Sequence, residues 1–218
     1  MDEPAPGLQS GYDAVADEYA AHFLHELDHK PLDRALLDWF AGQVRDRGVV
    51  ADMGCGPGQI GRYLHDRGVP MVGIDLSPAM VALAQQITPA IPFGQGNMLA
   101  LAEADDSWAG IVAFYSLVHL PSKQLPVALA EFYRVLRPGG LLLLSFHLGD
   151  ERVHLDDWWD HPVALDFYFH QRATMEAALM AVGFTVEAYL ERQPYVPVEH
   201  PSRRAYVAAR RPTEGGGA

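Results

Sequence analysis

The sequence predicts an α/β fold in which a mostly parallel sheet is covered by helices on both faces. Short apolar runs alternate with helical patterns along most of the chain, as βαβ units require. A glycine-rich loop follows the first apolar run directly, at 54–58. The chain has 218 residues, 49% of them hydrophobic, which suits one ordinary domain with a substantial core.

The first half of the chain is expected to begin with two helices. Apolar residues at helical spacing predict a helix over 10–28, which Pro31 separates from a second helix over 31–46. The run at 49–53 is apolar, β-branched and followed by glycines, so it predicts a buried strand. The remaining elements of this half are a helix over 58–67, a strand at 70–74, a helix that Ser77 and Pro78 open and that runs to about 86, and a strand at 91–93.

The second half repeats the alternation. Strands are expected at 110–115 and 141–146, with a helix over 122–136 between them that Arg137-Pro138-Gly139-Gly140 ends. An acidic, aromatic segment at 148–169 then precedes a helix over about 171–182. The last two strands are expected at 184–191 and 204–210, and 213–218 is typical of a flexible tail.

The composition excludes several classes of partner. The chain has 16 Lys+Arg against 28 Asp+Glu, and a surface with a formal charge of −12 repels nucleic acids and anionic membranes. The single cysteine cannot form an internal disulfide. The N-terminus does not resemble a signal peptide, and no run approaches the roughly 18 apolar residues of a membrane span. We therefore expect a soluble, cytoplasmic protein with no membrane or nucleic-acid partner; the oligomeric state stays open.

The glycine loop is the most informative segment. Gly54, Gly56 and Gly58 let the backbone pass close to a ligand without Cβ clashes, and the loop runs into a helix whose N–H groups favour negative charge. The loop also contains Gly56-x-Gly58-x-x-Gly61, which matches the dinucleotide fingerprint.

Two carboxylates accompany the loop. Asp52 ends the first predicted strand, where it would repel a pyrophosphate but suit a ligand that carries an ammonium group. Asp75 ends the second strand and can accept hydrogen bonds from ribose hydroxyls with either ligand. S-adenosylmethionine carries an ammonium, a carboxylate, a sulfonium and an adenosine, and so fits both carboxylates and the helix N-terminus.

The sequence resembles the class I S-adenosylmethionine-dependent methyltransferases over residues 10–211. The opening YDAVADEYA (12–20) is similar to the N-terminal helix of the branch that methylates small molecules and quinones. The matching motifs are VVADMGCGPGQIG (49–61), VGIDLSPAMVALA (72–84), GNMLAL (96–101), VAFYSLVHLP (112–121) and RVLRPGGLLLLSFH (134–147).

This resemblance implies a Rossmann-like sheet of seven strands, with the last strand antiparallel between the fifth and the sixth. It implies a single domain over 1–212, with the N-terminal helices (10–46) as a cap and 148–169 as a lid-like insertion. One departure from many relatives is Trp108-Ala109-Gly110, which opens the fourth strand where they have Phe-Asp.

The resemblance also implies a site for S-adenosylmethionine as cofactor. In the family, the loop lines the methionine end, Asp75 holds the ribose, and an N-terminal tyrosine closes over the cofactor. We expect Cys55, inside the loop, to be a small packing residue rather than a nucleophile. The cofactor residues that follow from the resemblance are Tyr19, Asp52, Gly54, Cys55, Gly56, Gly58, Asp75, Leu76, Met80, Asn97, Met98, Phe114 and Tyr115.

Two histidines are candidates for catalysis. His119 follows the fourth predicted strand and His147 follows the fifth, and an imidazole can accept a proton from a hydroxyl or amine. Each can instead be a histidine that shapes the pocket through a hydrogen bond to the backbone. The expected substrate-binding residues are Tyr12, His22, Phe23, His119, Trp158 and Phe169.

Three other features have less specific interpretations. His22, His25 and His29 have i, i+3, i+7 spacing on one predicted helix, but we interpret them as a partly exposed polar stripe and expect no metal. The aromatic and acidic residues of 148–169 suit either a surface excursion or a lid over a planar or cationic acceptor. Arg203-Arg204 is interpreted as a solvated strand end.

The activity expected is transfer of a methyl group from S-adenosylmethionine to an oxygen or nitrogen nucleophile of a small molecule, by in-line displacement. C-methylation of a quinone-like substrate stays open. The alternatives from other classes are an NAD(P)-dependent oxidoreductase and a non-catalytic protein that binds S-adenosylmethionine.

Overall fold

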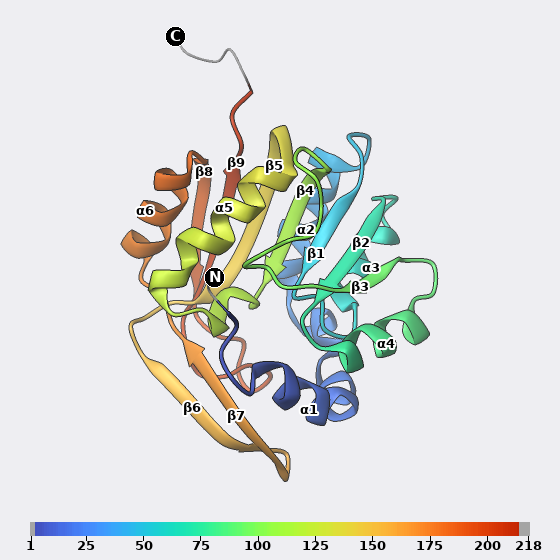
Figure 1. The fold of residues 1–218 in the computed structure, drawn as a ribbon, viewed down its shortest axis with the longest axis vertical. Helices are drawn as coiled ribbons and strands as arrows, with labels where there is room; N and C mark the ends of the chain where they lie inside the picture. Colours follow the sequence, from blue (N-terminus) through green and yellow to red (C-terminus); the bar gives the residue numbers. More distant parts are fainter. Residues whose placement is uncertain (1–2, 214–218) are drawn as a thin grey trace.

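The computed structural model describes residues 3–213 and contains a seven-stranded sheet of order β3-β2-β1-β4-β5-β9-β8 (Figure 1). β9 runs antiparallel to both β5 and β8, whereas the pairs among β1 to β5 are parallel. The predicted α/β fold, with the last strand inserted antiparallel, is therefore confirmed. The strands are β1 (Val50–Met53), β2 (Met71–Asp75), β3 (Phe93–Gln95), β4 (Trp108–Phe114), β5 (Leu136–His147), β8 (Thr185–Arg192) and β9 (Arg204–Arg210).

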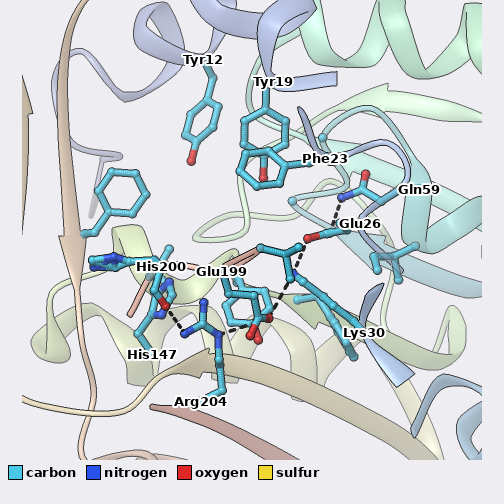
Figure 2. A pocket seen from close by; sticks show the side chains of 18 of the residues that line it. Tyr12, Tyr19, Phe23, Glu26, Lys30, Gln59, His147, Glu199, His200 and Arg204 are labelled. Atoms are coloured by element: carbon cyan, nitrogen blue, oxygen red, sulfur yellow. Dashed lines mark hydrogen bonds and ion pairs between the residues drawn. The ribbon is translucent and has the colours of Figure 1, made fainter. Parts of the chain in front are cut away.

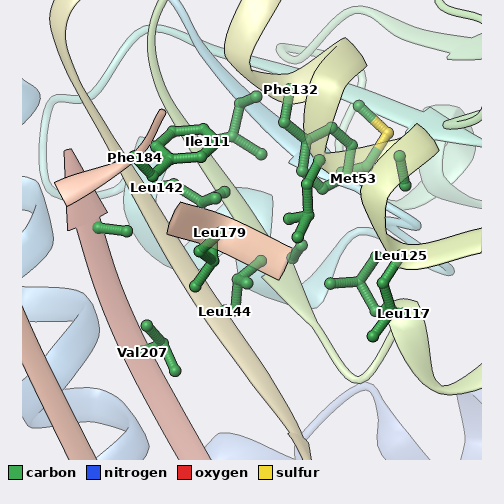
Figure 3. Packing of buried hydrophobic residues seen from close by; sticks show 14 of the residues in the cluster. Met53, Ile111, Leu117, Leu125, Phe132, Leu142, Leu144, Leu179, Phe184 and Val207 are labelled. Atoms are coloured by element: carbon green, nitrogen blue, oxygen red, sulfur yellow. The ribbon is translucent and has the colours of Figure 1, made fainter. Parts of the chain in front are cut away.

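Helices pack on both faces of this sheet, and each face has its own hydrophobic core. Along β5, Leu142 and Leu144 face the core that lies under α5 and α6 (Figure 3), while Leu141 and Leu143 face the core under α2, α3 and α4. This alternation is what a strand covered on both sides requires. The helices are α1 (Leu8–Phe23), α2 (Pro31–Val44), α3 (Gln59–His65), α4 (Pro78–Ile87), α5 (Leu125–Val135) and α6 (Arg172–Val182), with 3₁₀ turns η1 (Glu26–His29), η2 (Leu117–His119) and η3 (Ser122–Gln124).

Several boundaries differ by a few residues from the sequence-based expectation, including those of the first helix, the third strand and β5. The first helix ends at Phe23, and a separate 3₁₀ turn follows, so the predicted helix over 10–28 is wrong beyond 23. The third strand lies at 93–95 rather than 91–93. β5 begins at Leu136, because residues 137–140 bulge out of the strand where the β4–β5 register shifts, instead of forming a turn before it.

The segment at 148–169 contains a hairpin that the sequence pattern did not predict. β6 (Arg152–Trp158) and β7 (His161–Tyr168) form a separate antiparallel pair that extends below the main sheet beside α1 (Figure 1). Trp159 and Asp160 both have positive φ, at 54° and 63°, as a tight two-residue hairpin turn requires. Leu165 of β7 packs against Gly11 of α1, where a Cβ would approach Leu165 to 2.8 Å.

The hairpin therefore stands over the carboxyl ends of the central strands together with α1. The predicted tail at 213–218 lies mostly outside the described residues, since only Thr213 belongs to them. Within residues 3–213, no helix is both long and apolar enough to cross a membrane.

Candidate active site

Two adjoining cavities open at the carboxyl ends of the central strands. The large cavity has a volume of about 520 Å³ and the small cavity one of about 90 Å³. Ligands of open α/β sheets bind at this edge. The two cavities share part of their wall, which consists of Tyr12, Tyr19, Gly54, Gly56, Phe114 and Tyr115.

The glycine loop forms the floor between the cavities. Gly54 has φ +70° and lies against Ser116, whose Cβ would be 2.4 Å from a Cβ at Gly54, so no larger residue fits there. The N–H of Gly56 donates to Oδ2 of Asp75 over 2.8 Å, and the N–H of Ser77 donates to Oδ1 of the same carboxylate over 2.9 Å. Asp75 therefore ties the loop after β1 to the start of α4.

Asp52 is buried, and Oδ2 of its carboxylate accepts a hydrogen bond from the N–H of Gly61 over 2.9 Å. Burial raises the pKa of Asp52 to about 7; the Gly61 N–H lowers it and the nearby charge of Asp75 raises it again. Asp52 lines the large cavity and Asp75 the small one. A positively charged ligand group beside Asp52 would stabilise the ionised carboxylate. An ammonium group supplies such a positive charge.

The small cavity brings together the residues expected around an adenosine. Asp75 lies at one side of it, and the buried hydroxyl of Ser116 has no hydrogen-bond partner among residues 3–213. A polar ligand atom would satisfy this hydroxyl. The expected adenosine residues that line this cavity are Leu76, Met80, Asn97 and Met98.

The other members of the loop have different surroundings. Cys55 is buried and lines the large cavity, and burial raises the pKa of its thiol, which makes it a poor nucleophile. Gly58 lines neither cavity. It begins α3 with φ +84° and lies against the ring of Phe93, so its part in the site is the path of the backbone.

His119 is buried, and both its ring nitrogens are engaged. Nδ1 lies 2.8 Å from the backbone oxygen of Asp166, which only accepts, so Nδ1 carries the proton and donates. Nε2 then accepts a hydrogen bond from the hydroxyl of Tyr12 over 2.6 Å. Burial lowers the pKa of His119 to about 4, against the opposing effect of the Asp166 carbonyl. A neutral His119 thus orients Tyr12, which lines both cavities.

His147 lines the large cavity directly. Its Nδ1 lies 2.7 Å from Oγ of Ser202, and its ring stacks on Phe169 with centroids 4.9 Å apart. Burial lowers the pKa of His147 to about 3, and the charge of Arg204 lowers it further in the same direction. His147 is therefore neutral, and its Nδ1 is engaged by Ser202.

Most of the expected substrate-binding residues reach the large cavity. Tyr12, Phe23, Trp158 and Phe169 line it, whereas His119 lines the small one. His22 lines neither cavity; it is exposed and stacks on Trp159 at the hairpin turn, with centroids 4.5 Å apart.

The predicted stripe of His22, His25 and His29 is not formed on one helix. The first helix ends before His25, so the three side chains lose their common face. Among residues 3–213, no group of three His, Cys, Asp or Glu side chains is arranged to hold a metal ion.

A polar cluster in the large cavity was missed by the sequence analysis (Figure 2). Lys30, at the start of α2, pairs with Glu26 of η1 and lies 3.4 Å from Glu199. The side-chain amide of Gln59 donates to Glu26 over 3.0 Å. Arg204 is only 3% exposed, so its interpretation as part of a solvated strand end is wrong.

A buried ion network adjoins this cluster and contacts it through Glu199. Both terminal nitrogens of Arg192 donate to Glu199, and Nη2 also donates to Asp33 over 2.9 Å. Tyr206 donates to the other oxygen of Asp33 over 2.9 Å. These residues come from α2, β8, β9 and the loop before β9, so no local sequence pattern could group them.

Comparisons with known proteins agree with this fold. A family model described as a methyltransferase domain matches residues 50–140. A malonyl-[acyl-carrier protein] O-methyltransferase of Enterobacter lignolyticus (strain SCF1) is 32% identical over 152 residues, which cover 67% of this chain and 58% of that protein. A 2-methyl-6-phytyl-1,4-hydroquinone methyltransferase of Synechocystis sp. is 33% identical over 120 residues, which cover 53% of this chain and 37% of that protein. The chain thus spans less than two thirds of the length of these relatives.

Solved structures with the same fold include a SAM-dependent methyltransferase from Methanosarcina mazei, with TM-score 0.69, 18% identity and coverage of 76% of this chain and 93% of that one. The [4+2]-cyclase SpnF has TM-score 0.64 and 20% identity, and covers 83% of this chain and 81% of its own. At such identities the likeness concerns the fold alone.

The cavities fit S-adenosylmethionine, because an unpartnered hydroxyl at Ser116, a carboxylate at Asp75 and a buried carboxylate at Asp52 match its polar groups. The ordered motifs, the strand order and the family match point the same way. The chain belongs to the class I S-adenosylmethionine-dependent methyltransferases, whose cofactor is S-adenosylmethionine.

Proposed function

We propose that this protein transfers the methyl group of S-adenosylmethionine to an oxygen or nitrogen nucleophile of a small acceptor in the large cavity. The observation that carries the proposal is the shared wall of the two cavities, formed in part by Tyr19, Phe114 and Tyr115. A cofactor whose nucleoside lies in the small cavity and an acceptor in the large one would meet at this wall.

The cofactor supplies an activated methyl group on a positively charged sulfur. The chain's own contribution is mainly alignment of the acceptor, and such positioning is worth up to about 7–11 kcal/mol. The aromatic faces of Tyr19 and Tyr115 can stabilise a nearby cation. The hydrophobic wall, with Phe23 and Trp158, keeps water from the acceptor.

Each candidate for proton handling has a defined place in this proposal. His147 presents Nε2 to an acceptor and can take a proton from a hydroxyl, although its low pKa makes it a weak base. His119 acts through the hydroxyl of Tyr12, which it holds. An acceptor that binds already deprotonated needs neither histidine as a base.

The whole chain is proposed to act as one domain over 1–212. The helices within 10–46 form a cap, and the hairpin within 148–169 forms a lid over the acceptor. The partner of the protein is a small acceptor rather than a nucleic acid, because the chain has a formal charge of −12 and would repel a phosphate backbone. One relative is named a malonyl-[acyl-carrier protein] O-methyltransferase. Acyl groups linked to a carrier protein should therefore be among the acceptors that are screened.

C-methylation of a quinone-like acceptor is the second candidate. It is favoured by the relative that is named for a hydroquinone and by the aromatic rings of Trp158, Phe167 and Phe169, which suit a flat ring. Mass spectrometry of the methylated product distinguishes transfer to carbon from transfer to oxygen or nitrogen.

The test begins with cofactor binding and ends with turnover. Calorimetric titration should show saturable binding of S-adenosylhomocysteine and none of NADPH. A screen of small acceptors should then release S-adenosylhomocysteine from S-adenosylmethionine. Binding of NADPH alone would favour the oxidoreductase, and tight cofactor binding without turnover of any acceptor would favour the non-catalytic alternative.

A further inference from the structure

We infer that the acceptor carries a carboxylate, which the guanidinium of Arg204 binds in the large cavity, and that a flat apolar body is attached to it. This inference rests on the proposed function, because it names the class of acceptor for the same cavity.

Two nitrogens of the Arg204 guanidinium have partners, and the third, Nη2, has none within residues 3–213. Nη1 donates to the backbone oxygen of His200 over 2.7 Å, to Oγ of Ser202 over 2.9 Å and to the backbone oxygen of Ser202. Nε is buried, makes no hydrogen bond within residues 3–213 and forms an ion pair with Oε1 of Glu199 at 3.4 Å. Nη2 makes no hydrogen bond within the same range. Figure 2 shows the guanidinium reaching up toward the cavity.

A buried arginine with an unpaired terminal nitrogen is costly unless a ligand engages that nitrogen. An N–H of Nη2 can donate a charge-assisted hydrogen bond to a carboxylate oxygen, and such a bond is stronger than one to a neutral group. Because the hydrogen bonds of Nη1 and the ion pair of Nε fix the guanidinium plane, Nη2 is positioned before any ligand arrives.

The carboxylates near Arg204 are already paired with other cations. Glu199 accepts from Nη1 and Nη2 of Arg192 and from the N–H of Tyr195. Glu26 accepts from Lys30 and from Gln59. Arg204 therefore shares Glu199 with Arg192 and Lys30 and has no carboxylate of its own, and Lys30 is a second cation at the same cavity wall.

The hairpin argues against a cationic acceptor. Its carboxylates at 150, 151, 156, 157 and 160 are exposed, and Asp166 is paired with Arg152 and His154. The hairpin side chains that line the cavity are apolar: Val153, Leu155, Trp158 and Phe167.

The remaining wall suits a flat body beside the carboxylate. Phe169 and the ring of His147 are stacked at the cavity wall, and the ring of Tyr115 lies 5.9 Å from the guanidinium carbon of Arg204. A carboxylate is also ionised at neutral pH, so its recognition requires no base. This agrees with the lowered pKa values of His119 and His147, which leave both side chains neutral.

The test compares 1-naphthoate with 1-naphthamide, which have nearly the same shape but differ in charge. Calorimetry on the full chain saturated with S-adenosylhomocysteine should show the acid binding at least about 10-fold more tightly than the amide. Arg204→Gln should abolish this preference and leave the affinity for S-adenosylhomocysteine unchanged. Arg203→Gln is the matched control, because the neighbouring Arg203 is 54% exposed and pairs with Glu191; it should keep the preference.

Equal binding of acid and amide to the wild-type protein would overturn the inference, and this comparison does not depend on the folding of any variant. A preference that survives Arg204→Gln would overturn it as well. Absence of S-adenosylhomocysteine binding would instead contradict the proposed function, so the two failures are distinguishable.

Discussion

Burial sets the charge of four side chains in the site. It raises the pKa of Asp52 to about 7 and raises that of Asp75, while it lowers the pKa of His119 to about 4 and that of His147 to about 3. In each case the charged form is the one that burial disfavours. Ligand groups that pair with the carboxylates therefore bind more strongly than they would in water.

Asp75→Ala should weaken cofactor binding by about 10- to 100-fold. The ribose hydroxyls would lose a charged acceptor, and hydrogen bonds to charged groups contribute about 1.5–3 kcal/mol. The substitution also frees the N–H groups of Gly56 and Ser77. Calorimetric titration with S-adenosylhomocysteine measures the effect, with exposed Asp66→Ala at the end of α3 as control. Equal affinity of Asp75→Ala and the wild type would refute the role of Asp75.

His119→Gln should reduce the loss of stability at acidic pH. The folded-state pKa of His119 lies near 4 and the reference value is 6.5, so between these pH values only the unfolded chain binds the proton. The free energy of unfolding therefore falls as the pH falls through this window, by at most about 1.4 kcal/mol per pH unit for one histidine. Denaturant unfolding at pH 7 and pH 5 measures the slope.

The control for this experiment is His25→Gln, since His25 is exposed. Its slope should match that of the wild type. If His119→Gln also kept the wild-type slope, His119 would not be held neutral by burial.

At the scale of single elements, the tip of the β6–β7 hairpin makes one of its contacts with α1. Trp159 has a left-handed backbone at the turn, stacks on His22 of α1, and also stacks on Trp158, which lines the large cavity. The tip thus connects α1 to the wall of the large cavity.

His22→Ala should loosen the hairpin. Loss of one stacked pair, worth about 0.5–1.5 kcal/mol, should speed amide hydrogen exchange in β6 and β7 by a few-fold. Exchange in the central strands should stay unchanged. His25→Ala, a neighbouring exposed residue without this stack, is the control, and equal hairpin exchange in both variants would contradict the contact's role.

At the scale of the whole molecule, one buried ion network joins distant parts of the chain. Arg192 of β8 connects Asp33 of α2 with Glu199 of the loop before β9. Burial alone would raise the pKa of Glu199, but Arg192 and the Tyr195 N–H lower it to about 2. This network fixes the loop before β9, which lines part of the large cavity.

Arg192→Met should destabilise the protein by about 3–5 kcal/mol, because two buried carboxylates would lose their common partner. Denaturant unfolding measures the loss. Arg172→Gln breaks an exposed i,i+4 pair with Glu176 on α6 and should cost less than about 1 kcal/mol. Similar losses in the two variants would show that the network contributes little to stability.

Local patterns were sufficient for the sheet and for the cofactor side of the site. A buried strand, a glycine loop and a carboxylate at a strand end are contiguous in sequence, so 49–61 and 72–84 could be interpreted residue by residue. Asp52 and Asp75 lie at neighbouring cavities because β1 and β2 are adjacent parallel strands. The hairpin was missed because exposed acidic residues such as Asp156 and Asp157 interrupt its alternation.

The sequence by itself therefore determined the fold class, the family and the cofactor, each of which depends on short segments with strong local preferences. Only the tertiary structure decided which polar side chains line the large cavity. Lys30, Glu199 and Arg204 lie far apart in the chain, and the charge of each depends on partners that long-range packing brings to it. Whether an arginine is a solvated strand end or a buried cation with one unpaired nitrogen is a matter of burial, which local sequence does not encode.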